Sequence, residues 1–219
     1  MKIVKKEHEN PSATVHRGVR LAKMEKLLEV WVGKLIINGE LEEEDRCYVI
    51  YALTQFVESF ISYVSLFLLG TFLHKLWTTF WFILFFCVTR RSTGGYHANS
   101  YVQCYVGTIL IFLFVQVLYI PWMCDQHGWL VLSVLCSFSV LWRFAPINHE
   151  NWDLDNEEYR ATKLKVRRLL VAEMVTIIIM LLKNVDNGVI SSAATAANVV
   201  ALLVIIAKFI GQEVKQSGL

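Results

Sequence analysis

Long apolar runs alternate with short polar segments along most of the chain. After a polar stretch over residues 1–47, six such runs follow, at roughly Tyr48–Leu73, Leu76–Thr89, Tyr101–Ile120, Trp129–Phe144, Leu169–Leu182 and Val189–Ile210. A helix needs about 20 residues, or about 17 at the short end, to cross a hydrocarbon core of about 30 Å. The first, third and sixth runs reach that length, whereas the other three must use flanking residues or thin the membrane locally. The pattern predicts an all-α polytopic membrane protein with about six transmembrane helices.

The polar N-terminal stretch has a helical pattern of its own. Between Ala13 and Ile37, apolar residues recur at helical spacing and lysines fall between them. This pattern is typical of a basic amphipathic helix lying on an anionic membrane surface, and an ordinary helix packed on its own protein has the same spacing. We expect an amphipathic interfacial segment over residues 1–47, a six-helix transmembrane domain over 48–210 and a tail over 211–219.

Composition narrows the class of protein further. Of the 219 residues, 55% are hydrophobic and 18% are charged, and soluble domains usually have about 25% charged residues. The formal net charge of +2 is too near balance for a general nucleic-acid binder. The five cysteines include no C-x-x-C pair, which argues against a disulfide framework or a zinc ribbon. No H-E-x-x-H motif occurs either, and we expect no metal and no cofactor.

The basic residues predict the orientation in the membrane. All but two of the 21 lysines and arginines lie in the N-terminal segment, the second and fourth connections and the tail; the exceptions are Lys75 and Lys183. Cytoplasmic segments carry an excess of basic residues. We therefore expect a multi-pass membrane protein with both termini, the second connection and the fourth connection in the cytoplasm.

The second connection carries the candidate chemistry. It contains Arg90, Arg91 and the pair Gly94-Gly95, which permits a sharp bend closed to other residues. Ser100, with Gln103 three positions later, has the form of a capping box and predicts that a helix begins near Ser100. Cys104 would then lie at the end of the first helical turn, where unpaired amides and the helix dipole favour a thiolate.

His97 lies seven positions before Cys104. A cysteine deprotonated by a histidine is an activated nucleophile for acyl transfer. In a continuous helix seven positions correspond to a rise of about 10.5 Å, so a dyad requires His97 to fold back from the loop. A loop histidine and a cysteine in an apolar helix also occur without chemistry, and Arg90 and Arg91 could simply anchor the membrane edge.

The run from Arg91 to Cys104, with its Gly-Gly-Tyr-His-Ala core and a cysteine seven positions beyond the histidine, resembles the signature of the accessory gene regulator B (AgrB) family. These proteins are integral-membrane cysteine endopeptidases of Gram-positive quorum sensing. The resemblance implies that His97 and Cys104 are catalytic and that the substrate is an AgrD-like precursor peptide. It also implies removal of an acidic C-terminal tail, a thioester on the enzyme and cyclisation to a thiolactone or lactone. It places the protein in the bacterial plasma membrane with the catalytic site on the cytoplasmic side, and a homodimer would fit the family.

Further polar residues are candidates for positioning the substrate. Arg90, Arg91 and the basic cluster Arg160–Arg168 would attract an acidic tail. Glu58 lies inside the first apolar run, where it could orient His97, contact substrate or pair with an arginine. Glu173 lies inside the fifth run, about one turn from Arg167 and Arg168, and we expect it to pair with one of them.

Two other functions are compatible with the same chain. One is a peptide exporter or channel without proteolysis, which six spans with internal carboxylates would permit. The other is a membrane acyltransferase that forms a cysteine thioester with a lipid-derived group. Cys87 is the rival nucleophile if Cys104 is buried.

Overall fold

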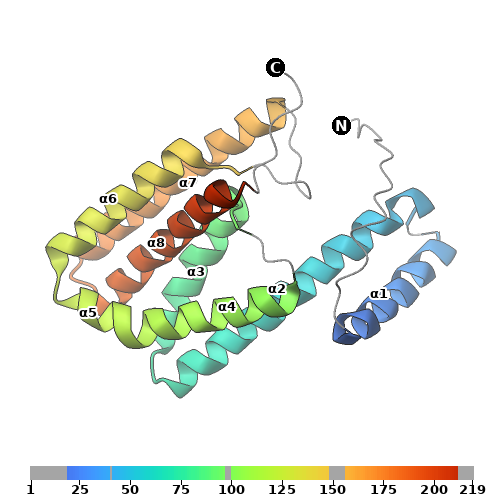
Figure 1. The fold of residues 1–219 in the computed structure, drawn as a ribbon, viewed down its shortest axis with the longest axis horizontal. Coiled ribbons are helices and arrows are strands. Elements are labelled where there is room, and N and C mark those ends of the chain that lie inside the picture. Colours follow the sequence, from blue (N-terminus) through green and yellow to red (C-terminus); the bar gives the residue numbers. More distant parts are fainter. Residues whose placement is uncertain (1–18, 40, 97–99, 148–155, 212–219) are drawn as a thin grey trace. The chain divides into compact units, whose positions relative to one another are not determined.

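The computed structural model describes residues 19–39, 41–96, 100–147 and 156–211. Within these ranges every regular element is helical, and the predicted all-α class is confirmed (Figure 1). The elements are α1 (Val19–Ile37), η2 (Glu43–Asp45), α2 (Arg46–Phe72), α3 (Leu76–Thr93), α4 (Tyr101–Phe114), η3 (Val115–Tyr119), α5 (Ile120–Cys124), α6 (His127–Phe144), α7 (Asn156–Leu182) and α8 (Asn187–Ile210).

Three helical segments in the described part of the chain are long and apolar enough to cross a membrane. They are Ala52–Phe72, Tyr101–Cys124 and Asn187–Ile210, and they match the first, third and sixth predicted runs. Gly128–Phe144 is apolar but shorter. The total of six crossings and the interfacial position of the N-terminal segment stay predictions.

The second of these segments is not a uniform α-helix. Its middle, η3, is π-helical, and α5 follows with Pro121 in its first turn. Proline has no amide hydrogen, so the α-helical hydrogen-bond pattern cannot run through it without interruption. Lys75 donates from its ammonium to the carbonyl of Gln116, inside η3. The side chain of Lys75, which immediately precedes α3, therefore satisfies a main-chain acceptor in the π-helical segment η3.

The chain divides into two compact units. The first comprises Met1–Ser62 and Ala98–Val106, and the second comprises Tyr63–His97 and Gly107–Leu219. Both α2 and α4 contribute residues to each unit. The first turns of α4 thus belong to one unit, and the end of α3 belongs to the other.

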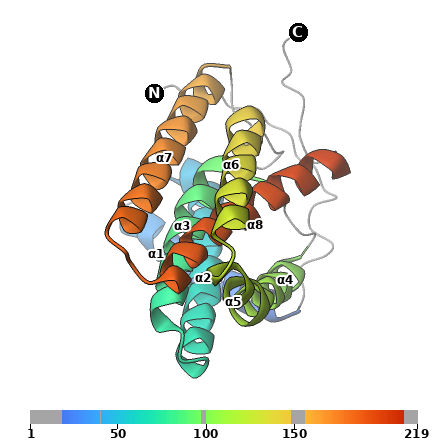
Figure 2. The ribbon, with the colours of Figure 1, turned by 90° about the vertical axis from the view of Figure 1, so that its left-hand side faces the viewer.

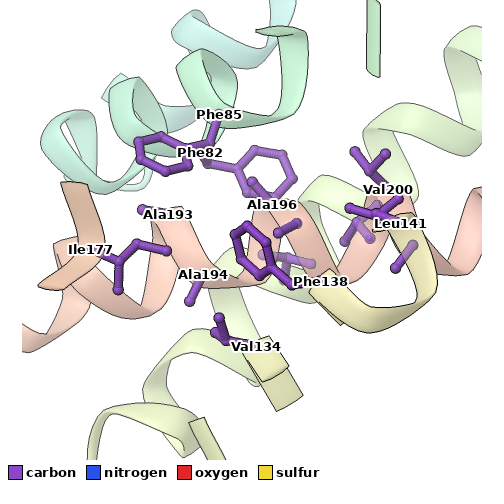
Figure 3. Packing of buried hydrophobic residues seen from close by; sticks show 14 of the residues in the cluster. Phe82, Phe85, Val134, Phe138, Leu141, Ile177, Ala193, Ala194, Ala196 and Val200 are labelled. Carbon is purple, nitrogen blue, oxygen red and sulfur yellow. The ribbon is translucent and has the colours of Figure 1, made fainter. Parts of the chain in front are cut away.

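Helix α8 is the centre of the second unit. It packs most extensively against α3 and α6 (Figure 2). Its buried face is rich in small residues, since Ala193, Ala194 and Ala196 are fully buried, and small side chains allow helices to approach closely. Larger side chains such as Phe82 of α3 and Phe138 of α6 fill the space around them (Figure 3).

Candidate active site

Helix α3 ends in a turn made by two glycines. Gly94 has a φ of +67°, and its amide donates to the carbonyl of Arg90 at 3.2 Å; Gly95 has a φ of +122°. Residues other than glycine rarely adopt these backbone angles. A Cβ at Gly95 would also lie 2.5 Å from Nη1 of Arg90 and 3.4 Å from the backbone of Leu203. The predicted sharp bend is confirmed, and the backbone conformation favours glycine at Gly95, where an added Cβ would also displace the Arg90 guanidinium.

Arg90 holds the main chain on both sides of this bend. Its half-buried guanidinium donates from Nη1 to the carbonyl of Gly94 and from Nη2 to the carbonyl of Tyr96. The guanidinium is a planar group with donors in a fixed fork, so it can serve two carbonyls at once. The structure thus gives Arg90 a main-chain contact that neither membrane anchoring nor tail attraction predicts.

Two further hydrogen bonds fix the turn to its neighbours in the second unit. The amide of Tyr96 donates to the carbonyl of Leu203 in α8 at 3.0 Å, and the amide of Ile147 donates to the carbonyl of Thr93 at 2.9 Å. The backbone is therefore held by α8, by Arg90 and by the segment after α6. His97 follows directly in sequence and lies outside the described residues, as do residues 98 and 99.

The start of α4 places Cys104 as the sequence predicts. The Oγ of Ser100 accepts a hydrogen bond from the amide of Gln103 at 3.3 Å, and the amide of Cys104 donates to the carbonyl of Ser100 at 3.1 Å. Cys104 is the fourth residue of α4 and is exposed. Cys104 therefore lies at the N-terminal end of α4, where the helix dipole is positive.

Glu58 lies in the same unit as Cys104. The Tyr101 hydroxyl donates to the main-chain carbonyl of Glu58 at 3.2 Å, which ties α2 to the first turn of α4. The Glu58 side chain is half-buried, and its Oε2 lies 3.5 Å from Nε2 of Gln55. Its expected role toward His97 stays a prediction.

The candidate residues are divided between the two units. Cys104 and Glu58 belong to the first, whereas Arg90, Arg91, Gly94 and Gly95 belong to the second. The structure brings Arg90, Gly94 and Gly95 together, and it leaves the Arg91 side chain exposed. The pairing of His97 with Cys104 stays a prediction.

The expected pairing of Glu173 with Arg167 or Arg168 is wrong. Glu173 is buried, and its Oε1 lies beside the hydroxyl of Thr89 on α3. Its Oε2 has no hydrogen-bond partner within the described ranges. The Arg167 guanidinium instead lies over the Trp142 ring, 4.9 Å from the ring centroid. No local pattern marks Thr89, because the two residues come from separate helices.

The other end of α3 has a hollow that none of the predicted site residues line. Its volume is about 500 Å³, and it is lined by Thr71, His74, Lys75, Leu76, Trp77, Thr78, Asp186 and Val189. No nucleophilic cysteine lies among these residues. Over the described ranges, no group of three histidine, cysteine or acidic side chains could hold a metal ion.

A comparison with protein-family models finds a match over most of the chain. The family model described as Accessory gene regulator B matches residues 28–210, which is most of the chain and includes the second connection. No curated protein and no solved structure matches this chain.

Proposed function

This chain belongs to the accessory gene regulator B (AgrB) family, and we propose that it is a membrane cysteine endopeptidase with His97 and Cys104 as its catalytic residues. The family takes part in processing quorum-sensing peptides of the AgrD type. The observation that carries the proposal is the position of Cys104. It is exposed in the first turn of α4, and the Ser100 hydroxyl caps the start of that helix. A nucleophile at this position is accessible to a peptide substrate and lies at the positive end of the helix dipole.

The proposed reaction begins with attack of the Cys104 thiolate on the scissile carbonyl of the precursor. The C–N bond breaks, the tail leaves as an amine that takes its proton from His97, and the retained fragment stays on Cys104 as a thioester. A thiol or hydroxyl within that fragment then attacks the thioester carbonyl and gives its proton to His97. The C–S bond to Cys104 breaks, and the fragment leaves as a thiolactone or lactone.

Cyclisation competes with hydrolysis of the thioester. A reactive centre at headgroup depth, beside short helices, would limit the access of water to the acyl group. The segment Tyr101–Cys124, which carries Cys104 in its first turn, is one of the three that are apolar enough to cross a membrane. This position of Cys104 supports a reactive centre at the membrane edge.

Arg90 would serve this reaction as a positioning residue. It bonds the carbonyls of Gly94 and Tyr96, and the second of these belongs to the residue before His97. Fixing Tyr96 limits the positions that the imidazole can reach. Precise placement of the base matters, because catalysis requires hydrogen-bond geometry at the reacting atoms.

The acidic tail of the precursor would contact the basic side chains of the cytoplasmic face. Arg91 is exposed at the end of α3, and Arg160, Lys165 and Arg168 are exposed on α7. Opposite charge raises the local concentration of a substrate and orients it. Both termini and the reactive centre would lie on the cytoplasmic side of the plasma membrane, and the enzyme would act as a homodimer.

Reconstitution in liposomes tests the proposal. The full chain is incubated with AgrD-type precursors, and cleavage is followed for Cys104→Ala and for the matched control Cys136→Ala, since Cys136 is also exposed on an apolar helix. We expect Cys104→Ala and His97→Ala to insert but not cleave, and Cys136→Ala to cleave normally. Export of an uncleaved peptide would favour a channel, and transfer of a lipid acyl group to Cys104 would favour an acyltransferase.

A further inference from the structure

We propose that Glu173 carries a proton and acts as a positioning residue: as a neutral acid it donates a hydrogen bond to Thr89, and it thereby holds the end of α3 against α7. The assignment of this proton rests on the contacts of Thr89 and Glu173 and does not depend on the proposed endopeptidase function. The effect on peptide processing also depends on the proposed endopeptidase function.

The contact between Glu173 and Thr89 is buried. Glu173 is 6% exposed and Thr89 is fully buried. The Thr89 Oγ1 lies 2.5 Å from Oε1 of Glu173 and 2.7 Å from the main-chain oxygen of Phe85. Thr89 therefore has two oxygen neighbours within hydrogen-bond distance, one on α7 and one on its own helix.

Counting hydrogens assigns the proton. A threonine hydroxyl has one hydrogen to donate, and a main-chain carbonyl only accepts. If Glu173 were ionised, Thr89 would face two acceptors with one hydrogen, and one contact would bring two oxygens together without a hydrogen. If Glu173 is protonated, it donates to Thr89, and Thr89 donates to the carbonyl of Phe85. The neutral acid therefore gives each of the two contacts a hydrogen of its own.

The charges around Glu173 agree with a neutral carboxyl. Its Oε2 has no hydrogen-bond partner, and no ion pair to Glu173 occurs among residues 19–39, 41–96, 100–147 and 156–211. Burying an unpaired charge inside a helix bundle is costly. The lysines and arginines on α7 and on the helices packed against it are Arg160, Lys163, Lys165, Arg167 and Arg168 on α7, Arg90 and Arg91 on α3, Arg143 on α6 and Lys208 on α8.

Several of those cations have other contacts. Arg90 bonds the main chain of the glycine turn, and Arg167 lies over Trp142. Arg143 and Lys208 both lie near the Phe144 ring, at 5.6 and 4.7 Å from its centroid. Glu173 therefore lacks the compensating cation that an ionised carboxylate in this place would need.

Thr89 connects Glu173 to the candidate active site. It directly precedes Arg90, and its carbonyl accepts a hydrogen bond from the Thr93 hydroxyl at 3.0 Å. The carbonyl of Thr93 in turn accepts from the amide of Ile147. A shift of Thr89 would therefore move the helix end that carries both Arg90 and the glycine turn.

Infrared spectroscopy of the full chain in liposomes tests the protonation. At neutral pH we expect a carbonyl-stretch band of a protonated carboxyl that shifts in D₂O and disappears in Glu173→Gln. The control Glu157→Gln alters an exposed carboxyl of α7 and should leave the band unchanged. If no such band is lost in Glu173→Gln, Glu173 is ionised and the proposal is overturned, whatever the protein does to precursors.

Cleavage kinetics test the positioning role. Glu173→Gln keeps a donor and should retain wild-type kcat, whereas Glu173→Leu and Thr89→Val should each lower kcat by about tenfold with KM unchanged. The double variant Glu173→Leu with Thr89→Val should lower kcat no more than either single variant, because each of these three proteins lacks the contact between positions 89 and 173. Wild-type kcat in folded Thr89→Val, with the infrared band present, would overturn the positioning role. A wild-type chain that cleaves nothing would refute the proposed function instead, and the infrared result would still decide the state of Glu173.

Discussion

The guanidinium of Arg90 donates a hydrogen bond to the carbonyl of Tyr96, the residue that immediately precedes His97. The same guanidinium bonds the carbonyl of Gly94, so one side chain spans the glycine turn. The conformation of the backbone at Tyr96 is thus set by Arg90, six positions earlier in the sequence. Arg90 therefore acts on the main chain through hydrogen bonds, in addition to any attraction between its charge and the substrate.

Replacing Arg90 by lysine should impair processing although the charge is kept. An ammonium group has no planar fork, so it cannot hold both carbonyls in the same geometry. Losing one charge-assisted hydrogen bond should lower kcat by about tenfold or more. The matched control is Arg46→Lys, which alters an exposed arginine paired with Glu43 on the surface. Equal kcat for the two variants in the liposome assay would contradict the role of Arg90.

Replacing Gly95 by alanine should disrupt the turn. The φ of +122° opposes a side chain there, and the backbone strain should cost about 1–3 kcal/mol. The added Cβ would lie 2.5 Å from Nη1 of Arg90 and would displace this guanidinium from the turn. Gly107→Ala is the matched control, since no heavy atom lies within 4 Å of the added carbon. We expect Gly95→Ala to lose cleavage and Gly107→Ala to keep it. Normal cleavage by Gly95→Ala would contradict this prediction, because it would show that activity does not depend on the glycine conformation at this position.

Replacing Ser100 by alanine should weaken the start of α4. Loss of the bond from the Gln103 amide to the Ser100 hydroxyl should cost about 1 kcal/mol of helix stability. Fraying of the first turn would displace Cys104, so both its alkylation rate and precursor cleavage should change. Ser100→Thr keeps a capping hydroxyl and should restore wild-type behaviour. Identical alkylation rates in Ser100→Ala and wild type would show that the cap does not control Cys104.

Replacing Arg91 by alanine should weaken capture of acidic precursors. Its side chain is exposed at the end of α3, so we expect a higher KM for a precursor with an acidic tail and an unchanged KM for one with a neutralised tail. Raising the ionic strength should reduce the difference between the two precursors, because salt screens exposed charges. Unchanged kinetics with the acidic precursor would remove Arg91 from substrate capture.

Features that depend on neighbouring residues could be predicted from the sequence. Ser100 and Gln103 predict where α4 begins, and Gly94 with Gly95 predicts the bend at the end of α3; both are confirmed. These features follow from local chemistry, namely a side-chain cap and backbone angles that favour glycine. The apolar runs likewise predict the helical class, because their length reflects the bilayer.

Features that depend on tertiary packing could not be predicted in this way. Glu173 and Thr89 are 84 positions apart, and a basic end within one turn of Glu173 suggested the wrong partner. The hydrogen bond from Tyr96 to Leu203 has no sequence signal either, because it joins main-chain groups. Glu173 therefore shows that a nearby opposite charge does not by itself predict an ion pair in a packed bundle.

The central claim is that Cys104 carries the retained precursor fragment as a thioester. Intact-protein mass spectrometry, after incubation with a precursor whose ring-closing thiol or hydroxyl has been removed, measures this directly. We predict an adduct with the mass of the retained fragment, located on Cys104, cleaved by hydroxylamine and absent from Cys104→Ala. Cleavage of the precursor with no adduct on Cys104, or an adduct on Cys87 instead, would contradict the account.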